Sequence, residues 1–426
     1  MVFMYSKQLN EQKYKSMAPT EITSPAANPS VRHGNPPGHY LPAHRALLTR
    51  LHNRYTHLAL LHLKLLRFLN CRPVMAAVSP APHSPPKMVD GEPNGHPGTG
   101  ARGGNVDDGI PVVDFDVLIN GTSDQRSQAV RDLGRACKDW GFFMVINHGV
   151  PEDLKKEFVE ACKELFGLPE EEKAEHLEAE PMAPIRIGSG FYAVVDGARY
   201  LRNYLKMFAH PELHCPAKPA KLRDVAAEYS AKTRDMMQHL ARAISESLGL
   251  DGGRISEALN LDSCLQFLVG NHYPRHTGPG DLGVRLPAHS DPGLLTLLFQ
   301  DGVDGLQVEH DGQWILAKPL PGAFFVIAGD QLEIVSNGRY KATVHRAVVG
   351  SEQERMSFVS MLSPSMDTVV EPLPELEQEG KGLQFRGVKY RDYMAYQQSN
   401  KLEAKEALNI VRVQHGDTNG RIEQLN

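Results

Sequence analysis

One stretch decides the fold: LPAHSDPGLLTLLFQDGVDGLQVEHDGQWIL (286–316). Its apolar runs LLTLLF, GLQV and WIL have the length of β-strands and are separated by residues that favour turns. Between the last two runs, Asp311 and Gly312 tolerate the positive φ angles of a type I′ turn, which predicts a hairpin. Further strands are predicted on the C-terminal side, at 323–327, 344–349 and 358–362. Many short strands with frequent turns predict a β-sandwich or a jelly-roll barrel.

The chain before this region has a helical pattern. Apolar residues recur at helical spacing in three segments, at 127–140, 152–166 and 221–248, and a short helix is predicted to start in 168–173. Two short apolar strands are predicted beside them, at 110–115 and 142–146, and a closing helix is predicted at 390–408. The combination predicts an α+β fold in which helices flank the strand-rich core.

Composition limits the kind of protein. The 426 residues carry a formal net charge of −5, and residues 1–75, with ten Lys plus Arg against two Glu (10 − 2 = +8), leave −13 for the rest. This acidic body gives no reason to expect nucleic-acid binding. The sequence contains no run of 18 apolar residues, so we expect no membrane-spanning helix. The five Cys are far apart, which argues against a zinc ribbon or a disulfide framework and favours a reducing compartment. We therefore expect a cytoplasmic protein, with the nucleus as a second location. A monomer is a separate expectation.

A candidate metal site begins at His289-Ser290-Asp291. In a strand, residues i and i+2 point the same way, so one imidazole and one carboxylate share a face. Such a pair arises by chance about once in a chain with this many His and Asp, and 415–417 holds a second one in a polar tail. His345, at the start of a predicted strand, strengthens the first pair, because two His and one carboxylate form the facial triad that holds non-haem Fe(II).

Arg355 and Ser357 follow His345 and share one face of the predicted strand that contains them. A buried arginine there needs an anion, and its planar fork fits a carboxylate. Other histidines admit two interpretations. His272 and His276 are either further metal ligands or, as we prefer, exposed loop residues, and His148 is predicted to make a structural hydrogen bond. The cysteines are predicted to be small buried apolar groups.

Together these motifs resemble the Fe(II)/2-oxoglutarate-dependent dioxygenases, and among them the plant branch with flavanone 3-hydroxylase, flavonol synthase, anthocyanidin synthase and gibberellin oxidases. The matching segments span about 110–400 in the family's order: IPVVDF at 110, WGFFMVINHGVP at 140, LFGLPEEEK at 165, SLGL at 247, NHYP at 271, HSD at 289, GLQV at 305, GD at 329, SNGRYKATVHRAVV at 336 and ERMSF at 354. The resemblance implies a double-stranded β-helix (jelly-roll) core and a 2-oxoglutarate-dependent dioxygenase that hydroxylates or desaturates a small molecule.

The resemblance also assigns roles. His289, Asp291 and His345 would be the iron ligands. Arg355 and Ser357 would bind the distal carboxylate of 2-oxoglutarate. Tyr273 would add a hydrogen bond to 2-oxoglutarate, and Asn271 would lie beside the end of 2-oxoglutarate that faces the metal. Fe(II), 2-oxoglutarate and O2 are implied, with ascorbate in support. The family's usual Thr between the first His and the Asp is Ser290 here, and its N-Y-Y-P-P-C is NHYPRH at 271–276, which alters the rim of the pocket.

The organic substrate is the least determined feature. Residues 185–210 are expected to line the pocket, and an apolar, aromatic lining is expected from Phe191, Tyr192, Tyr200 and Met361. A flavonoid or other phenolic is the first candidate and a gibberellin- or terpenoid-type hormone the second. Two other classes of protein remain as alternatives: a hydrolase that holds Zn(II) in the same triad, and a non-catalytic ligand-binding member of the fold.

Domain boundaries follow from composition and from the resemblance. Residues 1–105 are predicted to be a disordered extension and linker, since 76–105 holds six Pro and six Gly. A basic amphipathic helix at Ala46–Asn70, acting in organelle targeting or at a membrane surface, is the alternative for part of it. Residues 106–225 are predicted to be the N-terminal dioxygenase region, 226–400 the catalytic jelly roll, and 401–426 a helix end and tail.

Overall fold

A computed structural model describes residues 109–177, 179–188, 191–193, 199–275, 283–350, 352–377, 382–399 and 404–413. For 191–193, 199–200 and 399 it describes the backbone alone. The predictions for residues 1–105, including Cys71 and the alternative helix, and for His276 and 415–417 lie outside the described residues.

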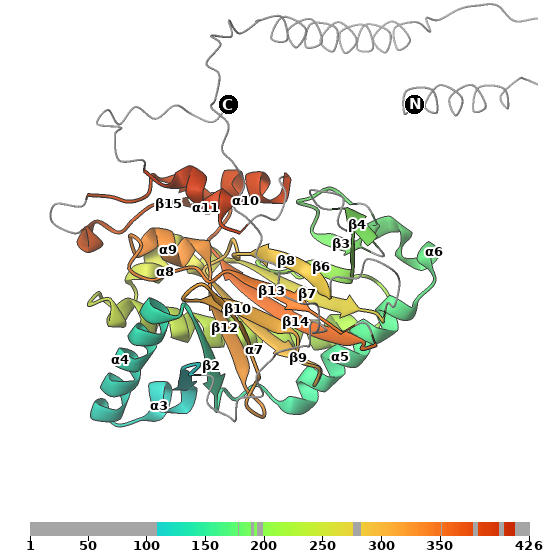
Figure 1. Cartoon of the computed structure of the whole chain (residues 1–426), viewed down its shortest axis with the longest axis horizontal. Coiled ribbons are helices and arrows are strands. Elements are labelled where there is room, and N and C mark those ends of the chain that lie inside the picture. The colour runs from blue at the N-terminus through green and yellow to red at the C-terminus, as the bar shows by residue number, and fades with distance from the viewer. Residues whose placement is uncertain are drawn as a thin grey trace, which may run out of the picture. The chain divides into compact units, whose positions relative to one another are not determined.

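Two sheets face each other in the described part of the chain (Figure 1). The larger one has eight strands, in the order β1 (Val112–Asp114), β2 (Phe142–Ile146), β12 (Phe324–Ala328), β9 (Leu295–Gln300), β14 (Arg355–Ser363), β7 (Leu265–Tyr273), β6 (Asn203–His210) and β3 (Ile185–Gly188). The smaller one has four, in the order β11 (Gln313–Leu316), β10 (Leu306–His310), β13 (His345–Val348) and β8 (Val284–His289). Two further antiparallel sheets have two strands each and pair β4 (Phe191–Ala193) with β5 (Arg199–Leu201) and β15 (Val369–Val370) with β16 (Val388–Lys389).

The central strands of the larger sheet are buried on both faces. All five residues of β12 are buried, and so are all residues of β9 except its last. Their near-continuous apolar sequences match this position, because a strand that alternates with polar residues would place those residues in the core. At the hairpin between β10 and β11, Asp311 has φ 49° and Gly312 has φ 74°, so both residues have the positive φ predicted for this turn.

Helices cover the outer face of the larger sheet. The helices on this face are the three longest, α4 (Ser123–Asp139), α5 (Glu152–Gly167) and α7 (Lys221–Ser247). The shorter helices are α3 (Phe115–Asn120), α6 (Glu170–Lys173), α8 (Arg254–Leu259), α9 (Asp330–Val335), α10 (Tyr390–Ser399) and α11 (Glu406–Val411). On β14, Phe358 packs against Phe158 of α5, and Ser360 bonds Thr233 of α7. Because side chains alternate along a strand, Arg355, Ser357 and Met361 face the opposite way, toward the smaller sheet.

Two predicted elements differ from the structure. The strand predicted over 110–115 ends at Asp114, because the Asp114 carboxylate accepts hydrogen bonds from the Asp116 and Val117 amides and caps α3. The helix predicted over 390–408 is divided into α10 and α11. Ala404, between them, instead forms a bridge to His289, with hydrogen bonds to the backbone of Ala288 and Ser290. The backbone groups of Ala404 therefore bond the edge of β8 and not a helix.

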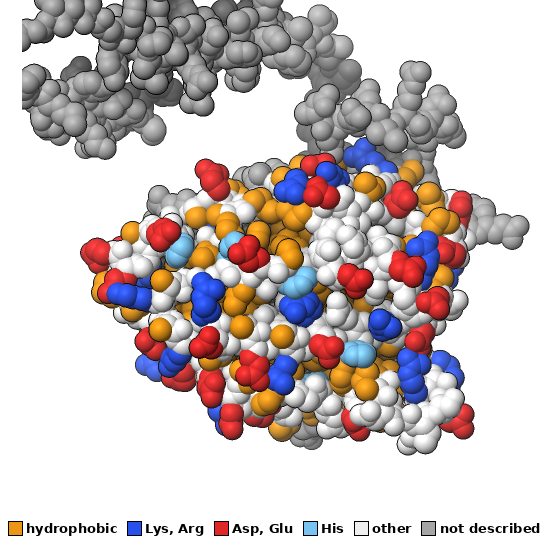
Figure 2. Space-filling model, turned by 180° about the vertical axis from the view of Figure 1, so that it is seen from behind, with side chains coloured by type: hydrophobic (Ala, Val, Ile, Leu, Met, Phe, Trp, Pro, Cys, Tyr) orange, Lys and Arg blue, Asp and Glu red, His pale blue; other side chains and the backbone are white. Residues whose placement is uncertain are grey.

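The sheets and helices confirm the predicted α+β jelly-roll fold. The domain boundaries stay predictions; α7 runs across the one placed after residue 225, and strands from both predicted regions share the larger sheet. On the surface seen in Figure 2, acidic and basic side chains intermingle. Among the described residues, no helix is long and apolar enough to cross a membrane.

Candidate active site

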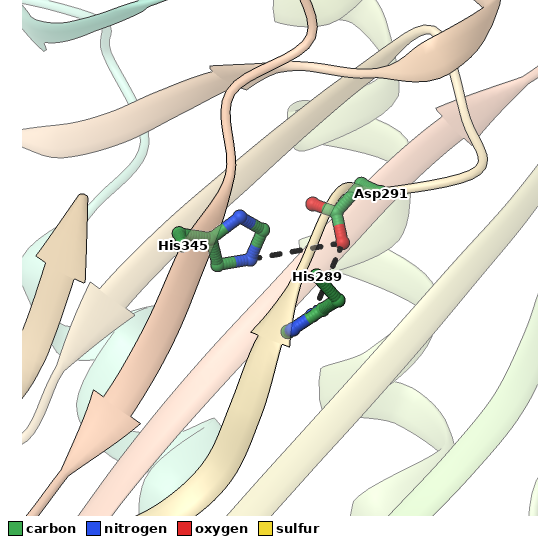
Figure 3. A group of neighbouring side chains, drawn as sticks. All are labelled: His289, Asp291 and His345. Atoms are coloured by element: carbon green, nitrogen blue, oxygen red, sulfur yellow. Dashed lines mark ion pairs between the residues drawn. The ribbon is translucent and has the colours of Figure 1, made fainter. Parts of the chain in front are cut away.

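The three predicted metal ligands come together. His289, the last residue of β8, lies directly opposite His345, the first residue of β13, and Asp291 follows β8 by two residues. The Asp291 Oδ1 atom is 3.7 Å from His289 Nε2 and 3.8 Å from His345 Nε2 (Figure 3). One ligand atom from each residue lies within 4.8 Å of the others, and all three residues are at least nine-tenths buried.

Hydrogen bonds fix which nitrogen of each imidazole faces the group. His289 Nδ1 lies 2.8 Å from the Pro287 carbonyl oxygen, and His345 Nδ1 lies 3.2 Å from that of Thr343. A carbonyl only accepts, so each Nδ1 carries the hydrogen and each Nε2 presents its lone pair. Burial and the neighbouring His345 lower the pKa of His289 to about 4, which favours the neutral ring.

The donor set fits a divalent metal ion. Two lone pairs and a carboxylate oxygen face one another without a hydrogen between them, and Asp291 Oδ2 is buried with no hydrogen-bond partner. Without a cation this would be an unfavourable arrangement, because buried acceptors are left unpaired. Two imidazoles and one carboxylate on one side of an ion match the facial triad of non-haem Fe(II).

A second layer of contacts holds the loop after Asp291. A Cβ at Gly293 would lie 2.7 Å from Met361 Sδ, and a Cβ at Gly329 would lie 2.2 Å from the Gly293 carbonyl oxygen, so both positions need glycine. The Asp330 amide donates to the Asp291 carbonyl at 2.8 Å, and the Asp330 carboxylate accepts from the Tyr393 hydroxyl at 2.7 Å. Helix α10 therefore helps to fix the metal-binding loop.

Arg355 provides a separate buried cation, with 1% of its surface exposed. Its Nε donates to Gln300 Oε1 at 3.1 Å and to the Val303 carbonyl at 3.2 Å, its Nη2 also donates to Gln300, and its Nη1 is buried without a partner. Burial lowers the pKa of Arg355, which stays charged. In the described part of the chain no carboxylate pairs with it. A free, buried Nη1 fits an anionic ligand such as 2-oxoglutarate.

The other predicted co-substrate residues lie beside Arg355. Tyr273 is opposite Arg355 across β7 and β14, with its ring centroid 5.3 Å from the guanidinium carbon. Asn271 is opposite Ser357, and its Nδ2 donates to Ser357 Oγ at 3.3 Å. Strand pairing thus places all four on one face, in two adjacent rows. Their roles toward 2-oxoglutarate remain predictions.

The predicted substrate residues are placed unevenly. For Phe191, Tyr192 and Tyr200 the structure describes the backbone of β4 and β5 but not the side chains. Met361 is 9% exposed on the inner face, close to Gly293. All of these stay predictions as substrate contacts.

The remaining predicted side chains take structural positions. The prediction that His272 is an exposed loop residue is wrong: it lies within β7, its side chain is 17% exposed, and its ring stacks on Phe166 on the outer face of the sheet. Its Nε2 lies 3.0 Å from Glu354 Oε1, and among the described residues it belongs to no group that could hold a metal ion. His148 makes the predicted structural hydrogen bond, with Nε2 2.7 Å from the Gly322 carbonyl oxygen. Four cysteines are buried and free, as predicted: Cys137, Cys162, Cys215 and Cys264.

Several interactions were not predicted. Gln300 holds Arg355, and its position at the end of a strand paired with β14 was visible only after register was known. Arg202 donates from Nε to Asn271 Oδ1 at 2.9 Å. Asp330 enters the sequence analysis only as part of a GD motif, although a buried acidic residue two positions after a fully apolar strand is itself a signal of a special position.

These features define a class of protein, the non-haem iron oxygenases with a jelly-roll core. Two family models match the chain: the 2OG-Fe(II) oxygenase superfamily over residues 264–364, and the N-terminal region named "non-haem dioxygenase in morphine synthesis" over residues 110–225. The chain belongs to the 2OG-Fe(II) oxygenase superfamily.

Similar proteins agree. The chain is 68% identical over 307 residues to 2-oxoglutarate-dependent dioxygenase 19 of Oryza sativa subsp. japonica, covering 72% of this chain and 91% of the relative. It is 37% identical over 309 residues to flavanone 3-dioxygenase 2 of the same plant, covering 71% and 87%. A crystal structure of JOX2 in complex with 2OG, Fe and JA matches with a TM-score of 0.65 and 30% identity, covering 72% of this chain and 89% of that one. The protein is a 2-oxoglutarate-dependent dioxygenase, and its cofactors are Fe(II) and 2-oxoglutarate.

Proposed function

We propose that this enzyme uses the His289, Asp291 and His345 cluster to hold Fe(II), and Arg355 with Ser357 to hold 2-oxoglutarate, while it hydroxylates a small plant metabolite at a C–H bond or removes two hydrogens from it to form a double bond. The observation that carries the proposal is the placement of two groups by the fold: two imidazole nitrogens and a carboxylate oxygen that converge within 4.8 Å, and a buried guanidinium whose Nη1 has no hydrogen-bond partner in the described part of the chain.

When bound, Fe(II) would activate O2, which is the oxidant, and 2-oxoglutarate would supply two of the electrons as it is decarboxylated to succinate and CO2. The chain supplies orientation and exclusion of water. The two imidazoles keep their lone pairs inward through their backbone hydrogen bonds. Arg355 is held by Gln300 so that Nη1 stays available to a carboxylate. Tyr273 packs in a buried cluster with Ala347 of β13 and Val349 just after it.

The substrate class is proposed at two levels. A flavonoid or other phenolic is supported by the named relative flavanone 3-dioxygenase 2 and by the aromatic residues predicted from the sequence. A hormone-type substrate is supported by the likeness to JOX2, whose structure contains JA. Residues 185–210 include β3 and β6, which join the larger sheet beside Asn271, and this supports the prediction that they line the pocket.

Succinate release that depends on Fe(II) tests the reaction. Purified protein with 2-oxoglutarate and a plant metabolite extract should release succinate, and metabolites changed in mass by about +16 or −2 should appear. Hydrolysis of a metabolite with Zn(II) in place of Fe(II), without succinate release, would identify a hydrolase instead. Binding of metabolites without any conversion would identify a non-catalytic member of the fold.

We also propose that the protein is a cytoplasmic monomer. The four buried, unpaired cysteines support a reducing compartment. Large apolar side chains that are more than a third exposed are few among the described residues and lie on separate elements: Val112, Ile119, Val369, Leu383 and Val413. Size-exclusion chromatography with light scattering tests the monomer directly.

A further inference from the structure

Three cations gather at the edge of the larger sheet, on its inner face. This cationic cluster consists of Arg186 on β3, Lys206 on β6 and Arg202 just before β6. Arg186 lies directly opposite Lys206 in the antiparallel pair. The ring of Tyr204 lies between the two arginines, with its centroid 5.9 Å from the Arg186 guanidinium carbon and 4.8 Å from that of Arg202. Like charges on opposed positions destabilise a sheet, so the arrangement calls for a reason.

The polar partners of the cluster are neutral. Lys206 Nζ donates to Gln398 Oε1 at 3.1 Å. Arg186 Nη1 donates to the same oxygen and to the Pro181 carbonyl oxygen, both at 3.5 Å. Arg186 Nε is buried without a hydrogen-bond partner, and Arg202 Nε donates to Asn271 Oδ1. Over the described ranges, no carboxylate forms an ion pair with any of the three. Two cations therefore share a single amide oxygen.

This arrangement has a cost to the fold. Burial, followed by the charges of Arg186 and Arg202, lowers the pKa of Lys206 to about 7. If the cluster served stability alone, a carboxylate on a neighbouring strand would be the simple solution, and one carboxylate near three cations would lower their energy. Destabilising groups of this kind are typical of sites that bind a ligand of the opposite charge.

The cluster adjoins the candidate active site. Arg202 bonds Asn271, which in turn bonds Ser357, so contact runs without a break from the cluster to the predicted co-substrate residues. The register places Lys206 opposite Val269 of β7, which is opposite Val359 of β14, one inner-facing row away from Met361. A group bound at the cluster would lie along the same inner face.

We propose that the cationic cluster binds a carboxylate of the organic substrate, so that the enzyme acts on a small organic acid. The planar forks of the two arginines suit a carboxylate, and the bound group would take the place of Gln398 Oε1 as the partner of Arg186 and Lys206. This inference rests on the proposed function and narrows it, because it favours the acidic members of both substrate classes over neutral ones.

Fractionation tests the proposal with the whole protein, loaded with Fe(II) and 2-oxoglutarate. A plant metabolite extract is divided into acidic and neutral fractions, and part of the acidic fraction is converted to methyl esters. The acidic fraction should stimulate succinate release above the substrate-free background, and esterification should weaken this at least tenfold. Stimulation by the neutral and esterified fractions alone would overturn the inference and leave the proposed function intact. Absence of stimulation by every fraction would count against the proposed function itself.

Substitutions then assign the effect to the cluster. Lys206→Met keeps the length of the side chain and removes the charge. It should raise the amount of acidic fraction needed for half-maximal succinate release about tenfold to a hundredfold, as expected for the loss of a hydrogen bond to a charged group. Lys206→Arg should restore most of the response. Lys218→Met, which removes an exposed lysine paired with Glu172, is the matched control and should behave as the parent.

Thermal unfolding separates binding from structure. Without substrate, Lys206→Met should melt no lower than the parent protein, because repulsion from Arg186 is relieved and the methionine can still pack on Phe267, whose ring centroid lies 4.6 Å from Lys206 Nζ. A melting temperature several degrees lower, together with an unchanged response to the acidic fraction, would show that the cluster is structural and would refute the proposal.

Discussion

The conservative substitution Arg355→Lys tests the co-substrate site most directly. The Arg355 guanidinium is fully buried, two of its nitrogens are engaged with Gln300 and Val303, and Nη1 is left free. Lysine keeps the positive charge but replaces a planar fork by a single ammonium, so it cannot hold Gln300 and grip a carboxylate with two parallel hydrogen bonds.

The size of the effect follows from how many hydrogen bonds to the carboxylate the substitution removes. One hydrogen bond to a charged group contributes about 1.5–3 kcal/mol, and about 1.4 kcal/mol corresponds to a factor of ten in affinity. Arg355→Lys should therefore weaken 2-oxoglutarate binding roughly tenfold to a hundredfold. Arg355→Ala should weaken it further, because the whole charge is removed, and Ser357→Ala should have the smallest effect of the three.

Anaerobic titration of the Fe(II) protein with 2-oxoglutarate, followed by the metal-to-ligand charge-transfer band, measures this affinity without turnover. Iron affinity should change little, since Arg355 lies outside the metal-binding group. If Arg355→Ala binds 2-oxoglutarate as tightly as the parent protein, then the free Nη1 does not receive the co-substrate and the reasoning is refuted.

Three further predictions concern the metal, a glycine and the C-terminal segment. Alanine at any one of the three metal positions should abolish succinate release and tight Fe(II) binding while circular dichroism stays that of the parent; retained turnover in all three would rule out the assignment of His289, Asp291 and His345. Gly305→Ala should destabilise the fold by about 1–3 kcal/mol in urea unfolding and weaken 2-oxoglutarate binding, because the new Cβ would lie 2.4 Å from the Val348 carbonyl oxygen and 2.7 Å from Arg355 Nε; Gly167→Ala, which meets open space, is the control. Burial raises the pKa of Glu333, but Lys405 and Arg412 outweigh it and leave the pKa below its usual value. A lowered folded pKa means that the stabilisation is fully present above about pH 4.5 and is lost as the pH falls through the folded pKa; Glu333→Gln should therefore remove this acid-dependent part of the unfolding curve, and an unchanged pH dependence would contradict it.

Sequence patterns succeeded where local chemistry decides the structure. The Asp311-Gly312 turn needed only residues that accept positive φ, and the apolar runs of β9 and β12 needed only burial on both faces. They failed where a distant segment competed. Apolar residues at helical spacing predict one unbroken closing helix. In the structure Ala404 forms a β-bridge with His289, and helical periodicity gives no sign of this distant contact.

The sequence by itself indicated the candidate metal ligands, because a His-x-Asp pair and a distant His are the ligand types of a facial triad. It also indicated the family, through motifs in a fixed order. Only the structure shows that Asp291 lies two residues beyond the end of β8 and not on the strand itself. The tertiary structure alone decided what surrounds these ligands. Gln300 reaches Arg355 through the pairing of β9 with β14. Arg186 meets Lys206 through the pairing of β3 with β6, and both meet Gln398 through the docking of α10. Register and docking depend on the burial of whole faces, so no local pattern could have placed these charges together.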